Sequence, residues 1–126
     1  MQTIRFDGIS LPVTDVNRSV AFYEQLGLTI EQTGQHFALL RKGASTIGLL
    51  YVKTLDDWPV ALRRNIHIEF STDDLDTLYT ELQASGVEFY QPPKDQKWER
   101  NMAILDPDGY RVEFAQGLRG DNAPTS

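Results

Sequence analysis

His67 and Glu113 are the two residues of this sequence whose side chains could carry out chemistry together. His67 begins an alternating segment, and Glu113 lies between the apolar residues Val112 and Phe114. A carboxylate next to an imidazole can act as a general base and acid, with Glu113 taking a proton from a carbon beside a carbonyl while His67 polarises or protonates the oxygen. The alternatives are a hydrogen-bonded structural histidine and a glutamate on the solvent face of a strand.

An internal repeat relates these two residues to two glycines. Residues 8–15 match residues 67–74 at an offset of 59 positions (67 − 8), and residues 37–40 match residues 102–105 at an offset of 65 (102 − 37). The same offsets place Gly8 at the position of His67 and Gly48 at the position of Glu113. A tandem repeat predicts two similar modules with a groove between them, which offers up to four equivalent side-chain positions. Only half of these positions carry a reactive side chain here.

The first copy reads as a strand, a helix and at least two further strands. Gly8–Val13 alternates as a strand does, so Gly8 and Ser10 share one face. A helix is predicted to follow Thr14 and Asp15, which are capping residues, and to end at Gly27. Two more strands, Phe37–Arg41 and Thr46–Val52, are joined by a tight hairpin over residues 42–45. The unit is therefore βαββ or βαβββ.

The second copy repeats this plan with a longer connection. It reads as a strand at His67–Ser71, a helix capped near Thr72 or Asp73 and ended by Gly86, and strands at Val87–Tyr90, Asn101–Leu105 and Tyr110–Gln116. The sequence Asp-Pro-Asp-Gly at residues 106–109 predicts a type I turn. Residues 91–100 are predicted to form a loop that is a lid or pocket wall, in which Trp98 either covers the groove or anchors the loop by packing.

Composition limits the possible partners. The chain has 126 residues, no cysteine and a formal net charge of −6, which argues against disulfides and against nucleic-acid binding. No apolar stretch is long enough to cross a membrane, so we expect a cytoplasmic protein without a membrane partner. We expect a single domain with module one at 4–53, a linker at 54–65, module two at 66–116 and a polar tail at 117–126.

Four motifs recur in a known superfamily: residues 13–28, 67–75, 84–88 and 106–113. With them the chain resembles the vicinal oxygen chelate superfamily, which includes glyoxalase I, extradiol dioxygenases, fosfomycin-resistance enzymes and bleomycin-resistance proteins. The resemblance spans Gly8–Gln116. It implies an α+β fold in which two tandem βαβββ modules form curved mixed sheets around a cleft, and it implies a homodimer.

The resemblance also implies a metal site that this chain fills only in part. In enzymes of the superfamily, the first strand of each module offers His or Gln and the last strand offers Glu to a divalent metal. His67 and Glu113 match the two ligands of the second module, whereas Gly8 and Gly48 replace those of the first. Because such metals usually need three or more protein ligands, we expect no cofactor. A weak Zn, Ni, Mn or Fe site, completed by Glu69, a substrate or a partner subunit, is the alternative.

Glycine inside a strand often marks close approach of a ligand or of another backbone. Gly8, Ser10, Gly48 and Leu50 are therefore predicted to form a roomy wall of a ligand-binding cleft, and His67, Glu69 and Glu113 an acidic wall, with Trp98 above. Such a cleft suits a small organic molecule with an apolar or planar body and a cationic end.

Three functions follow from this sequence. The first is a small-molecule binding protein that sequesters a hydrophobic or cationic ligand, as bleomycin-resistance proteins do. The second is a metal-assisted or Glu-based enzyme, either a lyase or isomerase or a dioxygenase of the same superfamily. The third is a scaffold that binds a protein partner.

Overall fold

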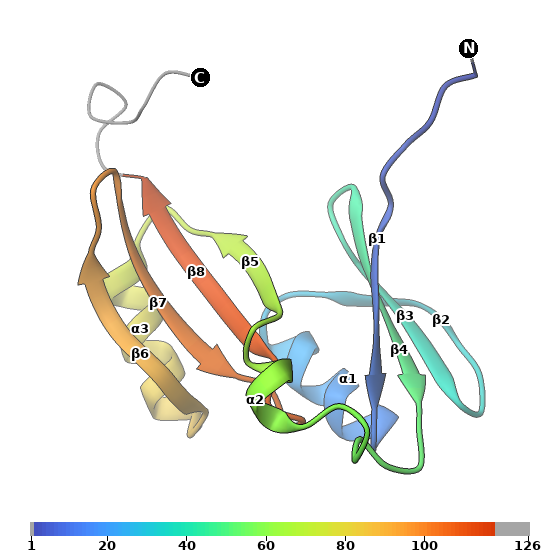
Figure 1. Ribbon diagram of the computed structural model, residues 1–126. Helices are drawn as coiled ribbons and strands as arrows, with labels where there is room; N and C mark the ends of the chain where they lie inside the picture. The colour runs from blue at the N-terminus through green and yellow to red at the C-terminus, as the bar shows by residue number, and fades with distance from the viewer. Residues whose placement is uncertain (1, 118–126) are drawn as a thin grey trace. The chain divides into compact units, whose positions relative to one another are not determined.

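The computed structural model describes residues 2–117, which divide into two compact units between Pro59 and Val60. The first unit contains β1 (Gly8–Val13), α1 (Val16–Gln25), β2 (Thr29–Thr33), β3 (Phe37–Lys42) and β4 (Ser45–Tyr51) (Figure 1). Its strands form one sheet in the order β1-β4-β3-β2, with β1 parallel to β4 and the other neighbours antiparallel. The first copy is thus a βαβββ module.

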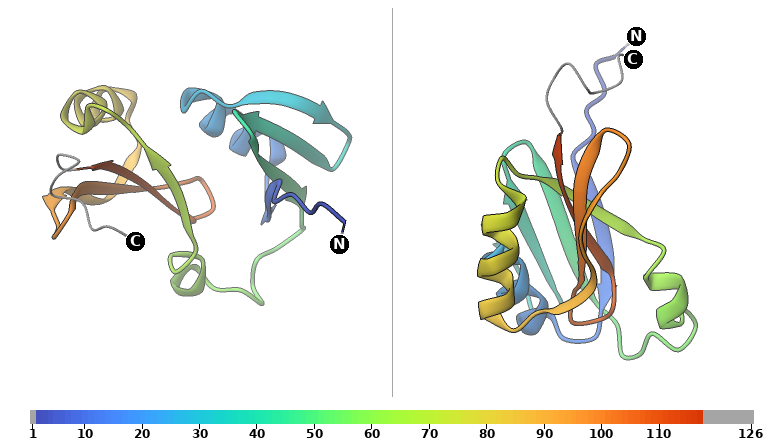
Figure 2. Two further views of the ribbon diagram at one scale, coloured as in Figure 1. Left: turned by 90° about the horizontal axis from the view of Figure 1, so that it is seen from above. Right: turned by 90° about the vertical axis from the view of Figure 1, so that its left-hand side faces the viewer.

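The second unit repeats this arrangement after a short additional helix, α2 (Val60–Arg63), which the sequence analysis missed. Its module contains β5 (His67–Ser71), α3 (Leu75–Ser85), β6 (Glu88–Asp95), β7 (Glu99–Leu105) and β8 (Arg111–Gly117), and the sheet order is β5-β8-β7-β6. Figure 2 shows α3 along one face of this sheet. The α+β class with two βαβββ modules is confirmed, whereas residues 118–126 of the predicted tail lie outside the described residues.

The strand registers confirm the internal repeat. In the first sheet Gly8 pairs with Thr46, and in the second His67 pairs with Arg111, so the two pairs differ by the predicted offsets of 59 (67 − 8) and 65 (111 − 46). One step further on, Ser10 pairs with Gly48 and Glu69 pairs with Glu113. The two modules therefore present corresponding residues on corresponding faces.

Each helix packs against its own sheet. In the first module Leu11, Val13, Tyr23, Leu40 and Leu49 are almost fully buried. In the second module Ile68, Leu75, Met102, Ile104 and Val112 are buried in the same way. Burial of one such side chain contributes roughly 1.5–3 kcal/mol, so these two apolar layers fix the backbone from which the polar faces project.

Capping residues set where the two helices begin. Asp15 caps α1 as predicted, since its Oδ1 accepts a hydrogen bond from Arg18 N–H at 3.0 Å. The cap of α3 is Asp74, which accepts from Thr77 N–H at 3.1 Å, so the prediction of Thr72 or Asp73 is wrong. The repeat itself points to Asp74, because it lies 59 positions after Asp15 (74 − 15).

The predicted loop at residues 91–100 is a correction to the sequence analysis. β6 extends to Asp95 and β7 starts at Glu99, so most of this segment is a β-hairpin. Gln96 N–H donates to the Glu99 carbonyl at 2.7 Å and closes the hairpin. The register between β6 and β7 shifts between Gln91 and Lys94, where the two prolines lie.

The turn at residues 106–109 forms as predicted. Gly109 N–H donates to the Asp106 carbonyl at 2.9 Å, and the Asp106 side chain accepts from two further backbone N–H groups. None of the helices within residues 2–117 has the length and apolar character that a membrane span requires.

Candidate functional site

The candidate site lies on the face of the second sheet that α3 does not cover. Parallel pairing of β5 with β8 sets His67 beside Arg111 and Glu69 beside Glu113. Paired residues of neighbouring strands project from the same face of a sheet, so these four side chains lie together. The alternate residues Phe70 and Phe114 face the other way, and their rings stack with centroids 5.5 Å apart. Packing of these apolar side chains on one face of the sheet directs the four polar side chains to the opposite face.

His67 and Glu113 meet as the sequence predicts. His67 Nδ1 lies 2.7 Å from Glu113 Oε1, and the two side chains are 42% and 15% exposed. Arg111 Nε lies 3.0 Å from the same oxygen. Both distances are those of ion pairs, yet no described donor is aligned to hydrogen-bond Glu113 Oε1, which is buried. The ion pair with Arg111 compensates the charge of this buried oxygen.

Arg111 is a site residue that the sequence analysis missed. Its guanidinium carbon lies 4.7 Å from the centre of the Tyr90 ring, which is a cation–π contact. This contact from the neighbouring β6–β7 hairpin holds the guanidinium over the sheet beside Glu113. Strand alternation alone would have placed Arg111 on the face of Glu113, because the two residues are two positions apart.

A pocket of about 290 Å³ opens beside Glu113 and is acidic. Its lining comprises Glu69, Phe70, Ser71, Glu99, Glu113 and Ala115. Glu99 was also missed, since it lies in the segment predicted as a loop. Asn101 Nδ2 donates to Glu99 Oε2 at 2.8 Å, and Gln91 Nε2 donates in turn to Asn101 Oδ1 at 2.9 Å. These side-chain amides hold the Glu99 carboxylate in place.

Trp98 and the candidate residues of the first module belong to other segments of the chain than the lining of this pocket. Trp98 is at the tip of the β6–β7 hairpin, 47% exposed, and does not line this pocket. Gly8, Ser10, Gly48 and Leu50 share the face of the first sheet that α1 leaves uncovered. A ligand-binding role for these five residues, and a cleft common to both sheets, stay predictions.

The structure shows what lies next to each of the two glycines. A Cβ atom at Gly8 would collide with the backbone carbonyl of Thr46, so close approach of β1 and β4 requires glycine there. A Cβ atom at Gly48 would lie 2.6 Å from Ser10 Oγ, the mobile end of a side chain. The interpretation that glycine leaves open room is therefore wrong at Gly8.

The donor set does not favour a divalent metal between His67 and Glu113. Within residues 2–117 no group of three or more His, Cys, Asp or Glu side chains is arranged to hold a metal ion. Arg111 also lies 3.0 Å from the carboxylate oxygen that a metal would need, and its positive charge repels a cation. Glu69 is the neighbouring carboxylate, and it lines the acidic pocket instead.

Comparison with known proteins agrees with this fold. The sequence model of the Glyoxalase/Bleomycin resistance protein/Dioxygenase superfamily matches residues 5–114. A bleomycin resistance protein of Staphylococcus aureus (strain MRSA252) is 28% identical over 125 residues, covering 87% of this chain and 95% of that protein. A bleomycin-binding protein in complex with bleomycin has a TM-score of 0.68 at 22% identity, covering 92% of this chain and all (100%) of the other. An antibiotic binding protein from Streptomyces sp. CB03234 has a TM-score of 0.72 at 24% identity, with coverages of 94% and 100%.

Proposed function

The chain belongs to the glyoxalase/bleomycin resistance protein/dioxygenase superfamily, and from that premise we propose that its second module binds a small organic molecule through a cationic N–H group. The observation that carries this proposal is the acidic lining of the pocket, to which Glu69, Glu99 and Glu113 each contribute a carboxylate. A protonated amine entering the pocket would donate hydrogen bonds to these carboxylates. A charge-assisted hydrogen bond of this kind contributes about 1.5–3 kcal/mol.

The charge of the pocket supports a cationic ligand. Glu69, Glu99 and Glu113 line it, and Arg111 is the basic side chain beside Glu113. The pocket therefore has three carboxylates and one neighbouring guanidinium. Because Arg111 pairs with Glu113, the carboxylates of Glu69 and Glu99 attract an ammonium group. The bleomycin resistance and antibiotic binding relatives support a role in small-molecule binding.

Calorimetric titration with two probes tests this function. Bleomycin, which the structural relative holds, and benzylamine, a minimal aromatic ammonium ion, are expected to bind, whereas neutral benzyl alcohol is not. Glu99→Gln keeps the shape of the side chain and is expected to weaken both probes by roughly tenfold, the loss of one charge-assisted contact. Glu81→Gln on the exposed face of α3 is the matched control with the same change in charge. Equal affinity of benzylamine and benzyl alcohol would contradict the proposal.

An acid–base enzyme is the second candidate, and the contact between His67 and Glu113 favours it. The 2.7 Å distance between Nδ1 and Oε1 brings an imidazole and a carboxylate together, the two groups that acid–base catalysis at one carbonyl compound requires. Glu113 would take a proton from a carbon beside a carbonyl, and a protonated His67 would give its proton to the resulting enolate oxygen. Exchange of the carbon-bound protons of hydroxyacetone into D2O tests this. Enzyme-dependent exchange that Glu113→Gln abolishes would establish the reaction.

Dimerisation is a separate proposal that comes from the resemblance of the sequence. Sedimentation equilibrium over a range of concentrations tests it directly, and a constant monomer mass would contradict it.

A further inference from the structure

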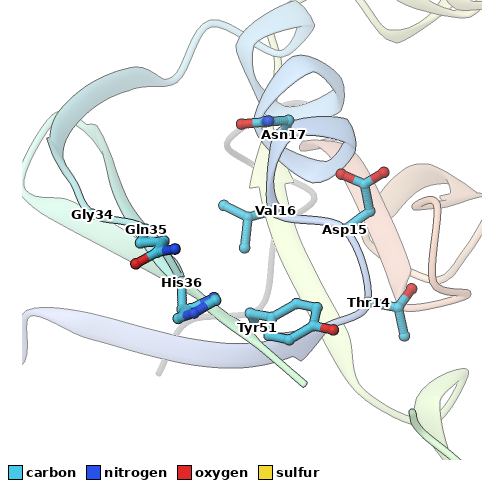
Figure 3. A pocket seen from close by; sticks show the side chains of 8 residues that line it. All are labelled: Thr14, Asp15, Val16, Asn17, Gly34, Gln35, His36 and Tyr51. Carbon is cyan, nitrogen blue, oxygen red and sulfur yellow. The ribbon is translucent and has the colours of Figure 1, made fainter. Parts of the chain in front are cut away.

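A second pocket, of about 300 Å³, lies in the first module where helix α1 begins. Figure 3 shows the first turn of α1 on one side and His36 and Tyr51 on the other, with the Val16 side chain directed toward that pair. This volume is at the lower end of the range found for small-molecule sites. The pocket shares no lining residue with the acidic pocket of the second module.

One wall of this pocket is aromatic. The His36 and Tyr51 rings stack with centroids 5.3 Å apart and an angle of 28° between their planes. Tyr51 N–H also donates to the His36 carbonyl at 2.8 Å, so the backbone fixes the pair. Tyr51 remains 44% exposed, which leaves part of its ring for contact with a planar molecule.

In the second module, a side chain of the protein itself binds the backbone at the start of α3. There the first helical residue, Leu75, donates its N–H to Gln116 Oε1 at 2.7 Å. By the repeat, Leu75 corresponds to Val16 (75 − 16 = 59) and Gln116 corresponds to Tyr51 (116 − 51 = 65). The second module thus fills this place with an amide oxygen of its own, and the first module has an aromatic ring there instead.

The two modules also differ in the charged residues at the start of the helix. Arg100 reaches the first turn of α3 and forms an ion pair with Asp76 at 3.0 Å. The corresponding residues of the first module are Gln35 (100 − 35 = 65) and Asn17 (76 − 17 = 59), and both line the pocket. Gln116 and Arg100, which contact the first turn of α3 in the second module, are therefore replaced in the first module by Tyr51 and Gln35.

We propose that the pocket at the start of α1 binds a planar aromatic amide. Its carbonyl oxygen accepts from Val16 N–H, as Gln116 Oε1 accepts from Leu75 N–H, and its ring lies on Tyr51. Asp15 lines the same pocket and caps α1 through Oδ1. The negative charge of Asp15 favours an amide NH2 group and disfavours a carboxylate. The site therefore selects a neutral aromatic amide over an aromatic acid.

Titration of the isotope-labelled protein with benzamide, followed by NMR, tests this site. Benzamide is expected to produce a saturable shift of the Val16 backbone N–H signal. Cyclohexanecarboxamide, which has the amide but no aromatic ring, is expected to bind more weakly by a factor of roughly 2 to 12, the contribution of one ring pair. Benzoate is expected to bind more weakly than benzamide. Absence of a saturable Val16 shift with benzamide would overturn the proposal.

Variants of Tyr51 separate a specific site from nonspecific binding. Tyr51→Gln introduces the residue that closes the second module, so it is expected to raise the dissociation constant of benzamide at least about tenfold by competition and loss of the ring. Tyr51→Phe keeps the ring and is expected to bind as the unmodified protein does. If Tyr51→Gln does not fold, Tyr51→Ala serves in its place with the same expected direction. Unchanged affinity in either ring-less variant would contradict the site.

Discussion

Glu69 and Glu113 are direct partners across the parallel strands β5 and β8, so their carboxylates leave the same face of the second sheet side by side. Among the described residues, His67 and Arg111 both lie within 3.0 Å of Glu113 Oε1. Two like charges at paired strand positions repel each other, and a fold without a use for them would gain stability by losing one. The pair therefore supports the proposal that this face of the second sheet binds a ligand.

Glu69→Gln is expected to stabilise the protein without ligand and to weaken ligand binding at the same time. Removing the repulsion with Glu113 should raise the free energy of unfolding by a few tenths of a kcal/mol. Urea unfolding measures this gain, and calorimetry with benzylamine measures the loss of affinity. Glu81→Gln on α3 again controls for the change in net charge. A loss of stability in Glu69→Gln would show that the two carboxylates do not repel each other.

Removing the charge of Glu113 is expected to destabilise the fold. Its side chain is 15% exposed and that of Arg111 is 20% exposed, so Glu113→Gln leaves a largely buried guanidinium without its counter-charge. We expect a cost of about 1–3 kcal/mol in urea unfolding. A double-mutant cycle with Arg111→Gln isolates the contribution of the pair, and additive effects of the two changes would argue against it.

The repeat predicted more of this structure than local patterns did. It identified His67 and Glu113 as the counterparts of Gly8 and Gly48, and it would have identified Asp74 as the cap of α3. The hairpin at residues 91–100 was missed because Pro92 and Pro93 are typical of loops. The structure accommodates them on β6, the edge strand, where the register shifts.

The contacts that shape the site depend on distances between strands that no pattern in the sequence gives. Arg111 is held by Tyr90 of the neighbouring hairpin, and Glu99 is oriented by Asn101. The same holds for Gly8, where the position of the Thr46 carbonyl requires glycine. Sequence reasoning therefore found the polar residues of the repeat but not those that orient them.

Gly48→Ala is expected to destabilise the first module only while Ser10 is present. The new methyl group would lie 2.6 Å from Ser10 Oγ, so the serine must rotate, at a cost of roughly 1–3 kcal/mol for a crowded site. In a Ser10→Gly background this cost should largely disappear. Gly8→Ala, which meets the Thr46 backbone, should have no such rescue. Equal costs of Gly48→Ala in both backgrounds would contradict the contact.

The stability of the protein in acid is expected to depend on Asp74. Hydrogen bonds from the Thr77 hydroxyl and backbone N–H lower the pKa of this carboxyl. A lowered pKa adds stability that is present above the ordinary value of about 3.9 and is lost as the pH falls through the folded value. Asp74→Asn retains the cap and removes the titration. Its urea unfolding curves between pH 2 and 5 should therefore change less with pH than those of the unmodified protein.

The stability in alkali is expected to depend on Tyr110. Burial, followed by the charges of Asp106 and Asp108, raises the pKa of this phenol from its usual 10.0 to about 12. A raised pKa means that the unfolded chain loses its proton first, so stability is complete below about pH 10 and falls as the pH rises toward 12. Two pH units correspond to a loss on the order of 2–3 kcal/mol. Urea unfolding between pH 9 and 12 measures it, and Tyr110→Phe should show a flatter dependence whatever its stability at neutral pH. If both proteins lose stability in parallel above pH 10, the phenol of Tyr110 is not the group that titrates.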